Sequence, residues 1–234
     1  MRKKDSTKKG FYDSVYFDLL DAMKEKICPI CSLIQKSEYR YMDTLFYELV
    51  NDPGIREKLR KSYGFCTKHA QLAKKMGNHL GIAIIYEDIC STLTEKMEKV
   101  GEISYPGKSC PVCKLVDEVE ERLLQSFLKN FSNKDFQERY RRSFGLCMPH
   151  FLLVYSRLTK QREKDTLKHW QLDTLREYLP QLKEFIRKHD YRFSHGGFGK
   201  EATSWREVVD KVAGNYHSYL TVQATNSPRH KEKN

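Results

Sequence analysis

A pair of short cysteine motifs occurs twice in this chain, and that repeat constrains the fold more than any other feature. The motif Cys-Pro-x-Cys lies at residues 28–31 and again at 110–113. The motif Gly-x-Cys-x-x-His lies at residues 64–69 and again at 145–150, so that nearly the same interval separates the copies of both motifs. Six of the seven cysteines belong to these motifs. Chance placement does not explain this pattern, and we infer a duplicated module.

The segments between and after the motifs have the apolar spacing of helices. Large apolar residues recur there at steps of three and four, which predicts amphipathic helices, and strand-like alternation is nearly absent. The stripes are Val15, Leu19, Leu20 and Met23; Tyr41, Met42, Leu45, Phe46, Leu49 and Val50; Ile82, Ile85, Ile89, Leu93 and Met97; Val116, Val119, Leu123, Phe127 and Phe131; and Leu167, Trp170, Leu175, Leu179, Leu182 and Ile186. We predict an all-α fold that opens with a helix at about 11–26 and ends with one at about 200–214.

The cysteines and histidines of each copy have the spacing of metal ligands. Cys-x-x-Cys and Cys-x-x-His are short chelates, and residues three apart on a helix share a face. We predict that each copy is organised around its own Cys₃His metal site. The predicted ligands are Cys28, Cys31, Cys66 and His69 in the first copy, and Cys110, Cys113, Cys147 and His150 in the second. The pattern leaves open that the ligands pair across the copies or share one binuclear centre.

Proline and glycine residues beside the motifs favour this geometry. Pro29 and Pro111 each follow the first cysteine of a motif, as proline does at the first position of a helix. The free N–H groups and the positive dipole end of such a helix favour thiolate over thiol. Gly64 and Gly145 permit tight turns just before the second ligand pairs.

A Cys₃His set is the closed, tetrahedral kind that proteins use for structural zinc, so we predict two zinc ions per chain. Because such a site keeps no open position for a reactive water, zinc-dependent hydrolysis is not expected. An iron–sulfur cluster is the main alternative, although clusters usually take four cysteines. Dithiol chemistry without a metal is a third, but a thioredoxin-like role needs a βαβ context that this sequence lacks.

The formal net charge of +11 does not by itself indicate a nucleic-acid-binding protein. Residues 1–9 carry a net +4 and residues 226–234 a net +2, so more than half of the excess lies at the two ends. Two basic clusters, at 58–61 and 139–142, precede the second ligand pairs. Nucleic acid is an alternative partner for these helices or the tails. We favour solvated helix faces that also offset the negative charge of thiolate sites.

The rest of the sequence offers no convincing Ser/His/Asp set and no pair of acid–base carboxylates. We therefore expect a protein without catalytic activity of its own. Cys90 lies in register with the apolar stripe of its helix and is expected to be a buried, inert thiol. The glycine-rich segment 194–199 lacks the spacing of a phosphate-binding loop. The histidines without metal-like spacing are His79, His169, His189, His195 and His217.

Four segments are predicted along the chain. They are a basic flexible N-terminus at 1–10, a first module with its leading helix at 11–105, a second module with the C-terminal helix at 106–214, and a flexible basic tail at 215–234. No apolar run approaches the roughly 18 residues that span a bilayer, and the basic N-terminus leads into no apolar signal segment. These features predict a cytoplasmic protein.

Further motifs accompany the doubled Cys/His pattern. They are Tyr-Asp-Ser-Val-Tyr-Phe at 12–17, Lys-His-Asp-Tyr-Arg-Phe at 188–193, and Ser-Trp at 204–205. Together they resemble an uncharacterised prokaryotic domain family of unknown function, over about residues 11–214. The resemblance implies that both copies and the C-terminal helix belong to one unit, and it implies no substrate or partner.

The leading hypothesis is a zinc-stabilised helical scaffold or interaction protein, whose partner is a protein and not a membrane. An iron–sulfur or thiol redox protein is the first alternative, and a nucleic-acid-binding protein is the second. The sequence leaves the identity of the metal, the partner and the oligomeric state open.

Overall fold

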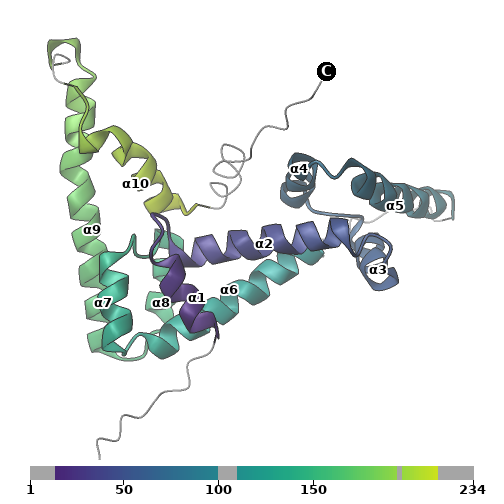
Figure 1. Cartoon of the computed structure of the whole chain (residues 1–234), viewed down its shortest axis with the longest axis horizontal. Helices are drawn as coiled ribbons and strands as arrows, with labels where there is room; N and C mark the ends of the chain where they lie inside the picture. The colour runs from purple at the N-terminus through teal and green to yellow at the C-terminus, as the bar shows by residue number, and fades with distance from the viewer. Residues whose placement is uncertain (1–13, 100–109, 194–196, 216–234) are drawn as a thin grey trace, which may run out of the picture. The chain divides into compact units, whose positions relative to one another are not determined.

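The computed structural model describes residues 14–99, 110–193 and 197–215 (Figure 1). These residues form ten α-helices and two short 3₁₀ helices, with no strand among them. The prediction of an all-α fold is confirmed. The predicted N-terminal segment, nearly all of the C-terminal tail, the boundary between the modules and part of the glycine-rich segment lie outside the described residues. None of the described helices combines the length and the apolar character that a membrane span requires.

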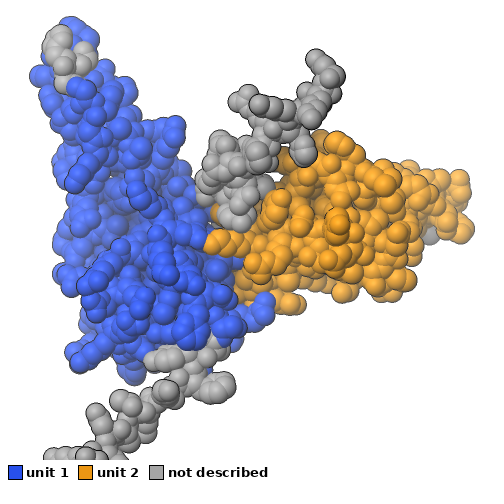
Figure 2. Space-filling view, in the orientation of Figure 1, with its two compact units in different colours: residues 1–33, 122–234 blue, residues 34–121 orange. Residues whose placement is uncertain are grey.

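The chain divides into two compact units that do not coincide with the two sequence copies (Figure 2). Unit 1 comprises residues 1–33 and 122–234, and unit 2 comprises residues 34–121. Helices α2 (Pro29–Tyr47) and α6 (Pro111–Asn130) each begin in one unit and continue in the other. Each unit therefore contains the start of one long helix and the Cys-Pro-x-Cys motif at that start.

Unit 2 contains three further helices, which are α3 (Pro53–Ser62), α4 (Thr67–Met76) and α5 (His79–Lys99). Helix α5 buries Ile85 and Ile89 from its predicted stripe. Asp88 on the same helix accepts hydrogen bonds from Arg56 Nε at 3.0 Å and Arg60 Nε at 2.9 Å, and so ties α3 to α5. Half-buried ion pairs of this kind fix the packing of two helices more than they add to stability.

Unit 1 contains five further helices, which are α1 (Ser14–Ala22), α7 (Lys134–Arg142), α8 (Met148–Arg157), α9 (Gln161–Lys188) and α10 (Ser204–Ala213). The 3₁₀ helices Tyr191–Phe193 and Lys200–Thr203 lie between α9 and α10. The core is aromatic: the ring of Phe127 lies 5.7 Å from that of Phe131 and 5.4 Å from that of Tyr140. Trp170 of α9 lies 5.8 Å from Tyr140, so α6, α7 and α9 meet in one cluster of rings.

The two copies also share their helix caps. At the start of α3, the side chain of Asp52 accepts a hydrogen bond from the N–H of Ile55 at 2.8 Å. At the start of α7, the side chain of Asn133 accepts one from the N–H of Asp135 at 2.9 Å. Asp52 precedes Cys66 by the same number of positions as Asn133 precedes Cys147. The repeat thus sets the start of the helix that leads into each Gly-x-Cys-x-x-His motif.

Candidate metal centres

The first ligand pairs lie at the N-termini of the two long helices. The N–H of Ser32 bonds the carbonyl of Cys28 at 2.9 Å, so Cys28 is the residue from which α2 starts and Pro29 is its first helical residue. Cys110 and Pro111 have the same roles at the start of α6. This local geometry confirms the expectation drawn from the prolines, and it directs free N–H groups at the thiols.

The second ligand pairs also lie at helix N-termini. Cys66 is the N-cap of α4 and Cys147 is the N-cap of α8, and neither side chain makes a capping hydrogen bond to its own helix. The turns that lead to them require a positive φ, which is +92° at Gly64 and +73° at Gly145. A side chain at either position would be strained. The two glycines therefore permit the turns that place the thiols of Cys66 and Cys147, as the sequence predicts.

The structure groups the eight predicted ligands differently from the within-copy prediction. Centre 1, in unit 1, combines Cys28 and Cys31 of the first copy with Cys147 and His150 of the second. The Nδ1 atom of His150 lies 3.5 Å from Cys28 Sγ, 3.4 Å from Cys31 Sγ and 3.1 Å from Cys147 Sγ. The sulfurs of Cys31 and Cys147 are 3.7 Å apart.

Centre 2, in unit 2, combines Cys66 and His69 of the first copy with Cys110 and Cys113 of the second. The Nδ1 atom of His69 lies 3.1 Å from Cys66 Sγ, 3.5 Å from Cys110 Sγ and 3.4 Å from Cys113 Sγ. The sulfurs of Cys66 and Cys113 are 3.6 Å apart. The prediction that each copy encloses its own site is therefore wrong, and the cross-copy alternative is the arrangement found.

The lengths of the helices explain why ligands from the two copies combine in each centre. Helix α2 has 19 residues, which is roughly 28 Å of rise, and it leads the chain away from the Cys-Pro-x-Cys motif at its start. Helix α3 has only 10 residues, or about 15 Å, so it retraces no more than about half of that distance before Cys66. The two copies carry identical ligand types, so pairing across the copies completes both ligand sets.

Both centres have the dimensions of a single tetrahedral ion. Zinc bound at about 2.3 Å by sulfur and about 2.0 Å by nitrogen places sulfurs about 3.8 Å apart and sulfur about 3.5 Å from nitrogen. The S–S distances of 3.6 and 3.7 Å are close to the first value, and the S–N distances of 3.1 to 3.5 Å reach the second or fall somewhat short of it. A disulfide needs sulfurs about 2.05 Å apart, so these cysteines are free thiols.

The thiols of each centre differ in their readiness to ionise. Burial alone would raise the pKa of Cys28, but hydrogen bonds from Cys147, Cys31 and His150 hold that pKa well below its usual value. In centre 2, burial is similarly outweighed for Cys110 by hydrogen bonds from His69 and backbone N–H groups, which lower its pKa to about 6. Hydrogen bonds with Cys147 and Cys28 raise the pKa of Cys31. One thiolate per centre is thus favoured and opposes the ionisation of its neighbours, which a bound cation reverses.

Comparison with known proteins agrees with the repeat. A family model described as "Family of unknown function (DUF6062)" matches residues 14–108 and again residues 99–219. The chain belongs to this family. It is also similar to a curated relative, the "Uncharacterized 23.9 kDa protein in xynA 3'region" of Caldicellulosiruptor sp. (strain Rt8B.4). The two are 26% identical over 210 residues, which cover 84% of this chain and 99% of the relative. No solved structure matches the chain.

The resemblance stated from the motifs is therefore confirmed: DUF6062 is a family of unknown function, and its model matches this chain twice. Both matched ranges contain one Cys-Pro-x-Cys and one Gly-x-Cys-x-x-His motif. Neither the description of the family nor that of the relative names an activity or a ligand.

Centre 1 is covered by the end of α10, a helix that the sequence predicts without assigning it a role. A Cβ atom on Gly214, whose φ is +83°, would lie 3.5 Å from Cys147 Sγ and 3.7 Å from Cys31 Sγ. Lys211 is fully buried beside the centre, and its Nζ donates a hydrogen bond of 2.7 Å to the carbonyl of Phe144. Burial lowers the pKa of Lys211 to about 8, against the opposing effect of the Cys28 and Cys147 charges. A buried cation next to three thiols suits a site of net negative charge.

Beside centre 2, a buried carboxylate contacts the ring of the histidine ligand. Glu38 Oε1 lies 2.6 Å from Nε2 of His69, on the side of the ring away from the sulfurs, and 2.7 Å from Nζ of Lys68. Burial would raise the pKa of Glu38, but hydrogen bonds from His69 and Lys68 lower it. A metal-binding histidine commonly donates its second N–H to such a carboxylate. Glu38 lies one helical turn before the buried Met42, so a charged residue on an apolar face was the signal that sequence reasoning missed.

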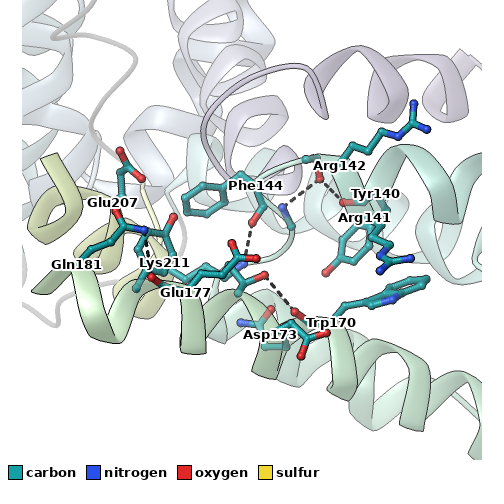
Figure 3. A pocket seen from close by; sticks show the side chains of 15 residues that line it. Tyr140, Arg141, Arg142, Phe144, Trp170, Asp173, Glu177, Gln181, Glu207 and Lys211 are labelled. Carbon is teal, nitrogen blue, oxygen red and sulfur yellow. Dashed lines mark hydrogen bonds between the residues drawn. The ribbon is translucent and has the colours of Figure 1, made fainter. Parts of the chain in front are cut away.

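A polar pocket of about 390 Å³ lies beside centre 1 (Figure 3). Gly145 and the buried Lys211 line it on the side of the centre, and Trp170 and Glu177 line it on α9. Glu207 of α10 also lines it, and burial with the charge of Glu207 raises the pKa of Tyr178 to about 12. The pocket thus brings opposite charges together next to the segment that positions Cys147.

The two basic clusters are largely engaged in ion pairs within their own helices or with a neighbour. Arg60 pairs with Asp88 at 2.9 Å, and Lys61 with Glu57 at 2.5 Å. In the second cluster, Arg139 pairs with Asp135 at 3.0 Å and Arg142 with Glu138 at 2.5 Å. The clusters consist of Lys58, Arg60 and Lys61, and of Arg139, Arg141 and Arg142. This pairing favours the interpretation as solvated helix faces.

Cys90 is exposed, so the prediction that it is a buried thiol is wrong. It follows Ile89 directly, and one residue turns an α-helix by about 100°, which carries Cys90 off the buried face that Ile85 and Ile89 share. Of the histidines without metal-like spacing, His79, His169 and His189 lie outside both centres, and His195 and His217 lie outside the described residues.

Proposed function

We propose that this protein is a zinc-stabilised helical interaction protein, with one zinc ion in each centre and no catalytic activity of its own. The observation that carries the proposal is the pair of closed ligand sets, each with three sulfurs and one imidazole nitrogen within 4.8 Å of one another. Three thiolates and an imidazole are a common set for structural zinc.

The spacing supports zinc over an iron–sulfur cluster. A cluster of several irons bridged by sulfide is wider than one ion, so its protein ligands lie farther apart than those of a mononuclear site. The ligand atoms of centres 1 and 2 are at the distances of a mononuclear site. The two centres would then add about −1 each to the charge of the protein, because three thiolates exceed the charge of one Zn²⁺ by one.

In this proposal, zinc supplies the connection between helices that are far apart in the sequence. Centre 1 fastens the N-terminus of α2 to that of α8, and centre 2 fastens the N-terminus of α6 to that of α4. Two helix dipoles thus point their positive ends at each set of thiolates. Because ligands from both copies complete each set, metal binding contributes directly to folding.

The same proposal includes a reducing, cytoplasmic location and a protein as the partner. The seven cysteines are all free thiols in the structure, which suits a compartment where thiols stay reduced. A four-ligand site without an open position favours binding over catalysis.

Elemental analysis of protein purified without oxygen tests the proposal. We expect a colourless sample with two zinc ions per chain, and one zinc ion per chain after Cys28→Ser, with Cys90→Ser as the matched control that keeps two. Iron with acid-labile sulfide and a brown colour would instead support the redox alternative. Retention on heparin that persists after both tails are deleted would support nucleic-acid binding by the helices.

A further inference from the structure

Helix α9 carries an apolar stripe that is only partly buried within unit 1. Leu167, near the start of the helix, is fully buried, but the exposed fraction is 55% for Leu179 and 69% for Ile186. Five residues at alternating steps of three and four form the α9 stripe: Leu172, Leu175, Leu179, Leu182 and Ile186. This is the spacing by which one helix packs along another. The predicted stripe of α9 is therefore correct in period, and the structure leaves its later part open to solvent.

A groove adjoins the first turns of the α9 stripe. Met148, Phe151 and Leu152 of α8 lie opposite Leu172 and Leu175 of α9 and enclose about 270 Å³ with them. Its remaining lining is Tyr155, Lys168 and Gln171, so the groove is apolar with one basic residue at its edge. A recess of this kind receives side chains that protrude from a partner helix. A lipid surface has no such protrusions, and therefore the recess favours a polypeptide over a membrane.

Charge is distributed unequally around α9. At about 100° per residue, Lys168, Arg176 and Lys183 lie within roughly a quarter turn of the α9 stripe. Asp173 and Glu177 lie on the opposite side of the helix, where they line the polar pocket of Figure 3. Arg176 Nη1 is 3.7 Å from Asp173 Oδ1 in an exposed pair, which holds the arginine only weakly. The border of the stripe is thus basic, and the carboxylates of this part of α9 face elsewhere.

We propose that the α9 stripe and its groove bind an acidic amphipathic helix of a partner protein. Apolar side chains of that helix, at steps of three and four, fill the groove and cover the stripe, and its carboxylates face Lys168, Arg176 and Lys183. A second copy of this chain fits less well, because two α9 stripes laid together bring two basic borders into contact. This inference deepens the proposed role as an interaction protein and rests on it.

Two designed peptides test the proposal with the full metal-loaded chain. Both are long enough for about five helical turns, with leucine at the same heptad positions, and one carries glutamate and the other lysine beside the leucines. By fluorescence anisotropy we expect the glutamate peptide to bind at least tenfold more tightly than the lysine peptide. Lys168→Glu with Lys183→Glu should reverse that preference. Leu179→Glu should weaken binding of the glutamate peptide at least tenfold.

The matched control is Val209→Glu, which changes an apolar residue of α10 that is 57% exposed. It should leave peptide binding unchanged. Failure of both peptides to bind, equal binding of the two, or equal effects of Leu179→Glu and Val209→Glu would overturn the proposal. Two further results would also overturn the proposal: binding to anionic phospholipid vesicles that Leu179→Glu abolishes, or a dimer in sedimentation velocity that Leu179→Glu abolishes. In the first case the stripe would bind a membrane, and in the second it would bind a second copy of the chain.

Metal content measured on the same samples separates this inference from the proposed function. A wild-type chain that holds two zinc ions but binds neither peptide contradicts only the docking surface. A chain that holds no zinc contradicts the proposed function, whatever the peptides do. Leu179→Glu should retain two zinc ions, because Leu179 is exposed and is not a ligand of either centre.

Discussion

Centres 1 and 2 have the same four ligand types, yet their surroundings differ. Lys211 and Gly214, at the end of α10, close centre 1, and all four of its ligands are fully buried. In centre 2, Cys66 and Cys113 are half-buried. The difference arises because the repeat supplies the ligands, while the cover comes from segments outside the repeated motifs. Duplication therefore produced two equal ligand sets with unequal access to solvent.

The largest expected difference between the centres concerns loss of a cysteine ligand. Cys147→Ser should lower the free energy of unfolding by about 4 kcal/mol or more, because it breaks a fully buried set. Cys66→Ser should cost about half as much, since water can reach the half-buried position and replace the lost ligand. Chemical denaturation of both variants in chelator-free buffer measures the two losses. Equal losses would show that burial does not distinguish the centres.

The rate of metal release should follow the same order. With a chromophoric chelator in excess, we expect two phases, and the slower should be at least tenfold slower than the faster. Cys66→Ser should remove the fast phase and Cys147→Ser the slow one, because centre 2 is the accessible site. A single phase in the wild-type chain contradicts the comparison.

The third expected effect concerns the neighbours of the ligands. Glu38→Gln should weaken zinc binding at centre 2 about tenfold, because the ring of His69 loses the carboxylate that orients its Nδ1 atom toward the sulfurs. Competition titration should show one of two binding steps shifted and the other unchanged. The control is Glu57→Gln, which removes an exposed carboxylate that pairs with Lys61 and belongs to neither centre. A shift of both steps would indicate a general loss of stability instead.

Much of this architecture follows from the sequence. The apolar steps of three and four predict the helices, the prolines and glycines predict the helix starts and turns at the motifs, and the eight predicted ligands are the residues that meet in the structure. What the sequence does not determine is the grouping, because Cys66 and Cys147 have the same chemistry and either can complete a set with Cys28. In the structure α2 is about twice as long as α3, so α3 alone does not return the chain to the start of α2.

The sequence predicts the spacing of apolar residues along the helices better than it predicts which side chains are buried. Cys90 follows Ile89 by one residue, and a single step around a helix decides whether a thiol faces the core or the solvent. Ile186 has the right spacing for a core residue but is exposed, because the 3₁₀ helix Lys200–Thr203 contacts this end of α9 through Lys188 and leaves the side chain of Ile186 uncovered. Glu38 and Lys211 are buried charges, which residue type alone predicts to be exposed. In all four cases the elements packed against the residue decide its burial, and a local sequence pattern does not say which elements these are.

A smaller effect is expected where α10 approaches centre 1. Gly214→Ala should destabilise the protein by about 1 kcal/mol, because φ is +83° there and alanine adopts such a conformation only with strain. The added Cβ would be in ordinary contact with Cys147 Sγ at 3.5 Å, so strain and not collision is the cause. The slow phase of metal release should accelerate while the fast phase stays unchanged. Gly77→Ala, at a φ of +76° with no neighbour near its Cβ, is the control for a positive φ away from the centres; its ψ of 11° strains alanine less than the ψ of 158° at Gly214, so a smaller loss of stability and no change in either phase are expected.

The smallest effect is expected for the replacement of Cys90. This cysteine is the reference against which losses at the two centres are compared. Cys90→Ser should change the free energy of unfolding by less than about 0.5 kcal/mol, because the thiol is exposed and belongs to neither centre. In the metal-loaded protein, iodoacetamide should modify Cys90 first, since a thiolate that is bound to zinc is shielded and Cys90 is free. After chelation, Cys66 and Cys113 should react next and Cys28, Cys31, Cys110 and Cys147 last, in the order of their exposure. Mass spectrometry of tryptic peptides measures that order, and simultaneous reaction of the two sets would mean that opening of the whole chain, and not local burial, controls access to both centres.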